Sequence, residues 1–136
     1  MQLALALYFD TNGVYPPSGG ADLYPNNSWS NSAVPVSWDT SSAFQIAIAP
    51  YMPKLLVDPI NQTGGWAGSS FYNIDYVRLT GYGCSSRAYL LVYKLENGSS
   101  TVSPGLLSCD GLQTFQYGGG ALNTANANGI ITIGVK

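Results

Sequence analysis

The sequence predicts an α+β fold: a short N-terminal helix packs on a small antiparallel β-sheet, and a long connection between them carries a further short helix. An apolar run near the N-terminus ends in glycine and proline, as helices do. The second half alternates and is rich in β-branched and aromatic residues, as strands are. A helix followed mostly by strands is typical of a sheet with helices on one face. A chain of 136 residues, 46% of them hydrophobic, suffices for one domain with a buried core.

The helix expected over residues 1–13 has a clear end but no clear beginning. No Ser, Thr, Asp or Asn stands at its front as a cap, whereas Asn12 and Gly13 offer the left-handed residue that closes many helices. Pro16 then forbids resumption. A helix this short is marginal alone in water, because nucleation is costly. We therefore expect that the fold holds it, that it was once longer, and that Met1 is a cloning start.

Residues 14–70 are expected to connect this helix to the strands. Within them, residues 18–40 are dominated by Gly, Pro, Asn and Ser, which predicts a loop. A short helix is expected near 41–49, with Thr40 or Ser41 as its N-cap. Its buried side is expected to consist of apolar residues, namely Phe44, Ile46, Ile48 and Ala49.

Residues 71–98 predict a β-meander. The stretch FYNIDYVRL at 71–79 alternates, and we expect the parity of Tyr72, Ile74 and Tyr76 to face the core. The stretch RAYLLVYKLE at 87–96 has high β propensity and runs into Asn-Gly, a turn signal. The two stretches therefore predict antiparallel neighbours.

Residues 99–136 are expected to form a C-terminal region. A weak strand is predicted over 112–117, followed by a glycine-rich break. The run IITIGV at 130–135 predicts the last strand.

The low charge of the chain limits its partners. Charged residues make up 9% of the chain, against about 25% in an ordinary globular protein. The five cations are scattered, so nucleic-acid binding by phosphate neutralisation is not expected. No stretch approaches the roughly 20 apolar residues of a membrane span. A surface covered by uncharged polar residues and Tyr is common in exported proteins.

The composition argues against an enzyme. The chain has no His, so the usual general base is absent, as are Ser-His-Asp and Cys-His arrangements. The acidic residues form no motif, and most stand at turns, where Asp favours the backbone geometry. No cofactor is expected, with one alternative: calcium, bound by oxygen ligands near Asp110 or in the stretch 123–128. Turn formation explains the same Asp and Asn residues without a metal.

Cys84 and Cys109 are the only cysteines. In an exported domain they suggest one disulfide, whereas two reduced cytosolic thiols are the alternative. A zinc site is not expected, because two Cys without His cannot supply four ligands.

The three tryptophans stand in expected loops, at Trp29, Trp38 and Trp66. Surface aromatics of this kind form flat platforms for sugar rings or for a partner protein. The alternative is that they pin long loops to the core, since a Trp buries a large area.

Three stretches of the chain each resemble a known sequence pattern, and they occur in the same order as those patterns. They are YFDTNGVYP at 8–16, APYMPKLLVDP at 49–59 and YLLVYKLENG at 89–98. They are similar to YYxDNGxYP, L-x-PYL-x-KLPxDPxN and YxLxxxLENG, patterns of the type IV pilin-like family, which includes bacterial pilins and the major pseudopilins of type II secretion. The stretches that hold the matches cover about a quarter of the chain. The matched positions are Tyr8, Asp10, Asn12, Gly13, Tyr15, Pro16, residues 49–55, Val57, Asp58, Pro59, Asn61, Tyr89, Leu91, Leu95, Glu96, Asn97 and Gly98.

The resemblance implies a pilin-like head on a longer N-terminal helix. In this family the first half of that helix anchors the subunit in the inner membrane before assembly and then packs in the filament core, while the second half packs on the sheet of the head. The resemblance thus implies self-association into a helical filament, reached through the inner-membrane assembly machinery, at the cell surface or in the periplasm. The residues that would serve this helix packing are Leu3, Leu5, Leu7 and Tyr8.

Two features separate the pilus from the pseudopilus. The acidic, glycine-rich calcium loop of many pseudopilins has no match after Asp110, whereas Cys84 and Cys109 resemble the disulfide-bounded region of pilins. We therefore expect a structural subunit of a type IV pilus-like filament that serves surface attachment or motility. The alternatives are a pseudopilin of type II secretion and an exported carbohydrate- or surface-binding module.

Overall fold

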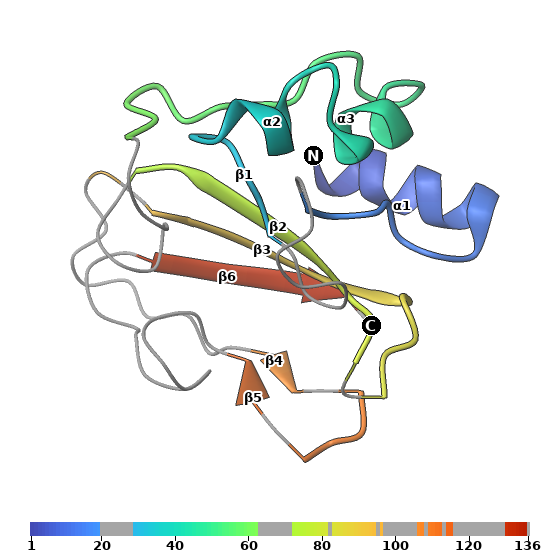
Figure 1. Ribbon diagram of the computed structural model, residues 1–136. Helices are drawn as coiled ribbons and strands as arrows, with labels where there is room; N and C mark the ends of the chain where they lie inside the picture. The colour runs from blue at the N-terminus through green and yellow to red at the C-terminus, as the bar shows by residue number, and fades with distance from the viewer. Residues whose placement is uncertain are drawn as a thin grey trace.

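The α+β prediction is confirmed by the computed structural model, in which helices cover one face of a four-stranded antiparallel sheet (Figure 1). The structure describes residues 1–19, 29–62, 72–81, 83–94, 96, 106–107, 109–112, 114–115 and 130–135.

The first helix, α1, spans Gln2–Asn12 and ends as the sequence predicts. Gly13 adopts the left-handed conformation, with φ of 71°, and its N–H donates to the carbonyl oxygen of Phe9. A glycine holds this conformation without the steric cost of a side chain, so the chain can turn back toward the sheet. Beyond the turn, the backbone N–H of Tyr15 donates to the carbonyl of Ser86, just before β3, across 3.0 Å.

The connection between α1 and the sheet is more structured than predicted. It contains β1 (Ser30–Asn31) and the short helix α2 (Pro35–Trp38), both within the expected loop. Pro35 supplies the fixed φ that suits a first helical turn. The next helix, α3 (Ala43–Ile48), confirms the short helix expected near 41–49.

Two details of the α3 prediction are wrong. Its N-cap is Ser42, whose side chain accepts from the backbone N–H of Gln45, and not Thr40 or Ser41. Ile46 is 62% exposed, because Phe44 and Ile48, four residues apart, both face the core, and Ile46 lies between them on the outer side. Ala49 is half-buried, and the polar Gln45 takes a buried place instead.

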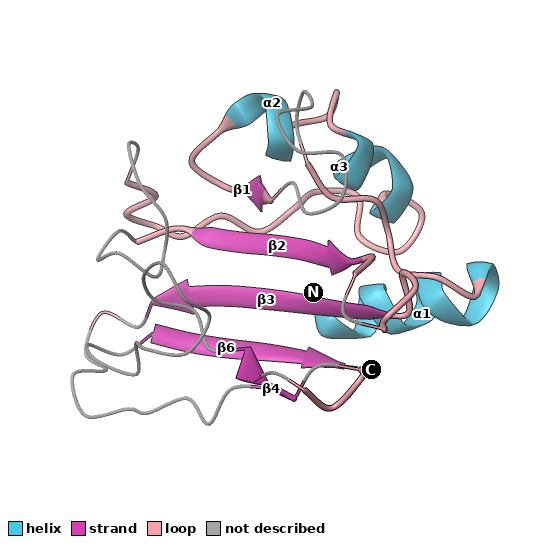
Figure 2. Cartoon of the chain, turned by 60° about the horizontal axis from the view of Figure 1, so that its bottom comes forward, coloured by secondary structure: helices cyan, strands magenta, loops and turns pink. Residues whose placement is uncertain are grey.

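The main sheet has the order β1-β2-β3-β6, with every neighbouring pair antiparallel (Figure 2). The strands β2 (Ile74–Leu79) and β3 (Ala88–Lys94) form the predicted antiparallel pair, and β6 (Ile130–Val135) is the predicted last strand. The Asn-Gly turn expected after β3 lies outside the described residues.

A second sheet of two short strands lies on the face opposite the helices (Figure 1). It pairs β4 (Leu106–Leu107) with β5 (Thr114–Phe115). The weak strand predicted over 112–117 is thus present but shorter, and β4 was not predicted.

The core fills both faces of the main sheet, whereas the alternation predicted one. On the helix side, Tyr76, Tyr89 and Leu91 pack with residues of α1 and α3, and the prediction for Tyr76 is confirmed. On the other side, Val77 and Leu90 are also buried, at 1% and 2% exposure. Cys109, which a disulfide joins to Cys84, packs on this second face of the sheet. The β2 side chains that point to this face, such as Val77, are therefore covered and do not face solvent.

Candidate functional site

The outer side of α1 is an exposed apolar surface. Leu3 is 74% and Leu7 is 42% exposed, and Asp10 is exposed as well. Positions three and four apart lie above one another on a helix, so these three residues form one stripe. We name it the α1 stripe.

The inner side of α1 belongs to the head itself. Leu5 has no exposed surface and lies in the core cluster, whereas Tyr8 is half-buried and meets Tyr51 edge to face at 6.2 Å between ring centroids. Of the four residues assigned to helix packing, only Leu3 and Leu7 are therefore available for large apolar contacts outside the head.

A second apolar surface surrounds a hollow of about 310 Å³ beside α2. Pro35 and Trp38 of α2 line one part of it. Leu55 and Val57, from the segment that follows α3, line another part. The charged side chains of Asp39 and Lys54 also line it. We name it the α2 hollow.

Two buried polar side chains hold the wall of this hollow in place. The indole Nε1 of Trp38 donates to the carbonyl of Leu56 across 2.8 Å. The amide of Gln45 accepts from the backbone N–H of Leu55 at 2.8 Å and donates to the carbonyl of Pro53 at 3.3 Å. Residues 53–56 are thereby fixed against α2 and α3, and the hollow is a built feature of the connection.

Exposed apolar side chains flank the α2 hollow. Val36 follows Pro35 and is 55% exposed, while Leu56 and Val57 are 55% and 50% exposed. Exposed apolar side chains gathered beside a hollow suit a surface for interaction. Among the described residues of the same connection, the further large exposed apolar side chains are those of Val34, Ile46 and Ile60.

The two charges of the hollow differ in their surroundings. The Ser41 hydroxyl donates to Asp39 Oδ1 across 2.5 Å and lowers the pKa of this carboxyl below its ordinary value, and the Ser41 backbone N–H acts in the same direction. Asp39 therefore stays ionised at neutral pH. Lys54 is the only cation of residues 29–62, so it supplies the positive charge of this surface.

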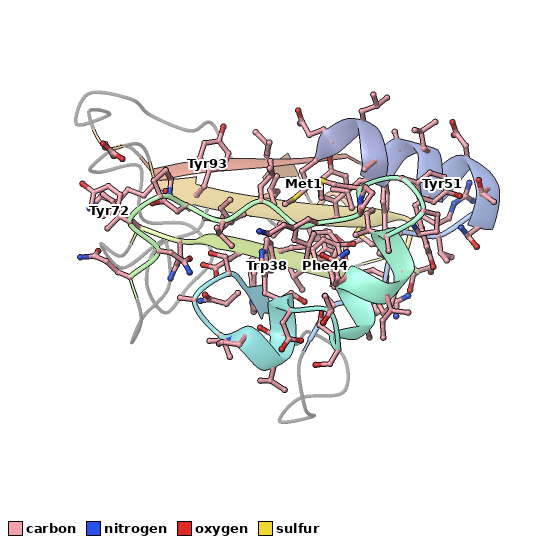
Figure 3. The ribbon with its side chains drawn as sticks, turned by 90° about the horizontal axis from the view of Figure 1, so that it is seen from above. Met1, Trp38, Phe44, Tyr51, Tyr72 and Tyr93 are labelled. Carbon is pink, nitrogen blue, oxygen red and sulfur yellow. A yellow bond between two sulfur atoms is a disulfide. The ribbon has the colours of Figure 1, made fainter. Side chains whose placement is uncertain are left out.

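Trp29 and Trp38, the two tryptophans among the described residues, belong to different core clusters and form no common platform. Trp38 is a buried core residue at 4% exposure and stacks obliquely on Phe44 at 5.3 Å, so its assignment as a surface aromatic is wrong (Figure 3). The indole of Trp38 donates to the backbone carbonyl of Leu56 and so holds this part of the connection to the core. This agrees with the alternative interpretation, in which the tryptophans attach long loops to the core. Trp29 is half-buried against the cluster around Val77, and Trp66 lies outside the described residues.

The predicted disulfide is present between Cys84 and Cys109. It ties the segment before β5 to the turn between β2 and β3, on the sheet face away from the helices.

The described part of the chain contains no group of three His, Cys, Asp or Glu side chains that could hold a metal ion. Asp110 is exposed, and its Oδ1 accepts from the backbone N–H of Leu112 at 3.1 Å, as in a turn. Calcium binding there stays a prediction.

The sequence did not single out the α2 hollow. Its one visible signal is the run Lys54–Val57, in which the only cation of residues 29–62 is followed by three apolar residues. The fold converts this run into a surface because Leu55 is drawn inward by the amide of Gln45, which leaves Leu56 and Val57 outside.

Comparisons with protein-family models, with curated proteins and with solved structures found no match. Among the described residues, no helix is long and apolar enough to cross a membrane.

Proposed function

We propose that this chain is the head of a non-enzymatic filament subunit of the type IV pilin-like kind, which self-associates at the cell surface or in the periplasm. The observation that carries the proposal is the two-sided character of α1: Leu5 packs into the head, while Leu3 and Leu7 present an apolar stripe outward. A helix that is apolar on both sides suits burial against a second partner. The three ordered sequence motifs and the disulfide support the same proposal.

The first test asks whether the protein occurs in filaments. An antiserum against this chain is applied to cells that carry the gene, and gold labelling is followed by electron microscopy. Labelled surface filaments support the proposal. If the protein is found only as a soluble monomer, the proposal is wrong. If secretion of other proteins fails on deletion while surface filaments are unaffected, the function is that of a type II secretion pseudopilin.

The second test removes the stripe without disturbing the head. Leu3→Asp and Leu7→Asp are expected to reduce the number of filaments at least tenfold, because an ionised carboxylate in an apolar contact is costly. Leu112→Asp is the matched control, since Leu112 is 81% exposed and lies outside α1. Equal filament numbers in all three variants would contradict the role of the stripe.

A further inference from the structure

We propose that the α1 stripe of one copy docks into the α2 hollow of a second copy, with Asp10 facing Lys54. The inference rests on the proposed function for the filament that results, but the contact itself concerns two copies of this chain. It assigns a partner to both exposed apolar surfaces.

The two surfaces are both apolar and exposed. Leu3 and Leu7 stand about 6 Å apart along the helix axis, at about 1.5 Å per residue, and point to one side. Such a pair is the usual anchor of a helix that lies in an apolar groove. The α2 hollow offers about 310 Å³ with apolar walls from Pro35, Leu55 and Val57. Docking would cover apolar area that each copy alone leaves in water.

The charges fix the orientation. Asp10 is the only charged side chain of α1 and lies about one turn beyond Leu7 on the same stripe. Lys54 is the only cation of residues 29–62 and lines the hollow. Asp39 lines it too, with its carboxylate hydrogen-bonded by Ser41. The C-terminal end of the docked helix therefore lies beside Lys54 and away from Asp39, because like charges repel.

The placement of the two surfaces makes the association open-ended. Figure 3 shows α1 along one edge of the molecule and α2 along the opposite edge. A copy that offers its α1 stripe to one neighbour keeps its α2 hollow for another. Head-to-tail contacts of this type build helical filaments when the rotation does not close into a ring.

The docking is tested by cross-linking two purified variants of the whole chain. Leu7→Cys and Val57→Cys are mixed at several hundred micromolar and oxidised with copper phenanthroline. The expected product is the heterodimer of the two variants, in at least fivefold excess over either homodimer. The control mixture pairs Leu112→Cys with Val57→Cys and is expected to give no such excess. No excess in the first mixture, or an equal one in both, would overturn the docking.

A charge swap tests the orientation on the same material. Asp10→Lys and Lys54→Asp, each combined with the cysteine variants, are expected to reduce the heterodimer at least threefold when made alone. When Asp10→Lys on one partner meets Lys54→Asp on the other, the yield is expected to return. A swap that restores nothing would overturn the pairing of Asp10 with Lys54.

The proposed function and the docking fail separately. Labelled filaments without the heterodimer would leave the filament subunit standing and refute this contact. A heterodimer without labelled filaments in cells would retain the contact and refute the filament.

Discussion

The hydroxyl of Tyr76 on β2 donates to the backbone carbonyl oxygen of Pro16 across 2.8 Å, a contact that spans 60 residues of sequence. The ring of the same tyrosine stacks on Phe44 of α3, with 4.1 Å between centroids and 7° between planes. Tyr76 is fully buried, so one side chain ties the sheet both to the turn that follows α1 and to α3.

Tyr76→Phe is expected to destabilise the chain by about 1–3 kcal/mol, because it keeps the stacked ring but leaves the carbonyl of the buried Pro16 without its donor. Urea unfolding followed by fluorescence gives the free energy. Tyr51→Phe is the matched control: its hydroxyl donates to Thr11 at an exposed site, and its loss is expected to cost under about 0.5 kcal/mol. Equal losses in both variants would contradict the special role of Tyr76.

The chain is expected to lose stability in alkali. Desolvation by burial raises the pKa of Tyr76 well above the ordinary value of 10.0, and burial raises those of Tyr15 and Tyr89 in the same direction. Above pH 10 the unfolded chain releases protons that the folded chain keeps. The stability that these protonated tyrosines contribute is therefore fully present below pH 10. It is lost as the pH rises toward the pKa values that the tyrosines have in the folded chain.

The contribution of Tyr76 is measured by how steeply the free energy of unfolding falls with pH. Each buried tyrosine that stays protonated lowers the free energy of unfolding by about 1.4 kcal/mol per pH unit above its unfolded pKa. Urea titrations between pH 8 and pH 11 measure the slope. Tyr76→Phe is expected to flatten it, and an unchanged slope in that variant would mean that Tyr76 ionises in the folded state.

The fold was predictable wherever local signals and tertiary structure agree. Gly13 ends α1 because glycine adopts the left-handed conformation easily, and β2 and β3 pair because both have the composition of strands. The burial of Val77 was not predictable from alternation, since it depends on a segment about 30 residues later that the disulfide brings onto the sheet. Long-range cover of this kind leaves no trace in the local pattern.

The α2 hollow illustrates the same limit at the candidate site. The buried position of Gln45 contradicts its polarity, and only its three hydrogen bonds to the chain at Met52, Pro53 and Leu55 explain it. The exposure of Leu3, in contrast, is a consequence of helical geometry once Leu5 is placed inside.

Gln45→Leu is expected to cost about 2–4 kcal/mol, because it removes all three of these hydrogen bonds and leaves the buried backbone N–H of Leu55 without its acceptor. The neighbouring Ile46→Gln is the matched control, since Ile46 is 62% exposed, and its effect is expected to stay within about 0.5 kcal/mol. Thermal unfolding compares the two. The same Gln45 variant should also lose the heterodimer described above, as the wall of the hollow is no longer fixed.

Replacing both cysteines by Ala is expected to lower the free energy of unfolding by about 3.5 kcal/mol, the loop-entropy value for a closed loop of 25 residues. Unfolding of the native chain with and without reductant gives an independent measure. If the free energy of unfolding falls by less than about 1 kcal/mol in both experiments, the segment around Cys109 is held on the sheet without the disulfide.

Gly13 and Gly83 form a matched pair that separates backbone strain from crowding. Both have a positive φ, of 71° and 74°, so a side chain at either position is strained by about 1–2 kcal/mol. A Cβ at Gly13 would meet nothing within 4 Å, whereas at Gly83 it would lie 3.0 Å from the backbone nitrogen of Asp110, next to Cys109. Gly83→Ala is therefore expected to cost at least about 1 kcal/mol more than Gly13→Ala, as measured by urea unfolding. In the chain that lacks both cysteines the segment can move away, and the difference between the two variants should shrink. A difference that persists there would show that Asp110 is held against Gly83 by contacts other than the disulfide.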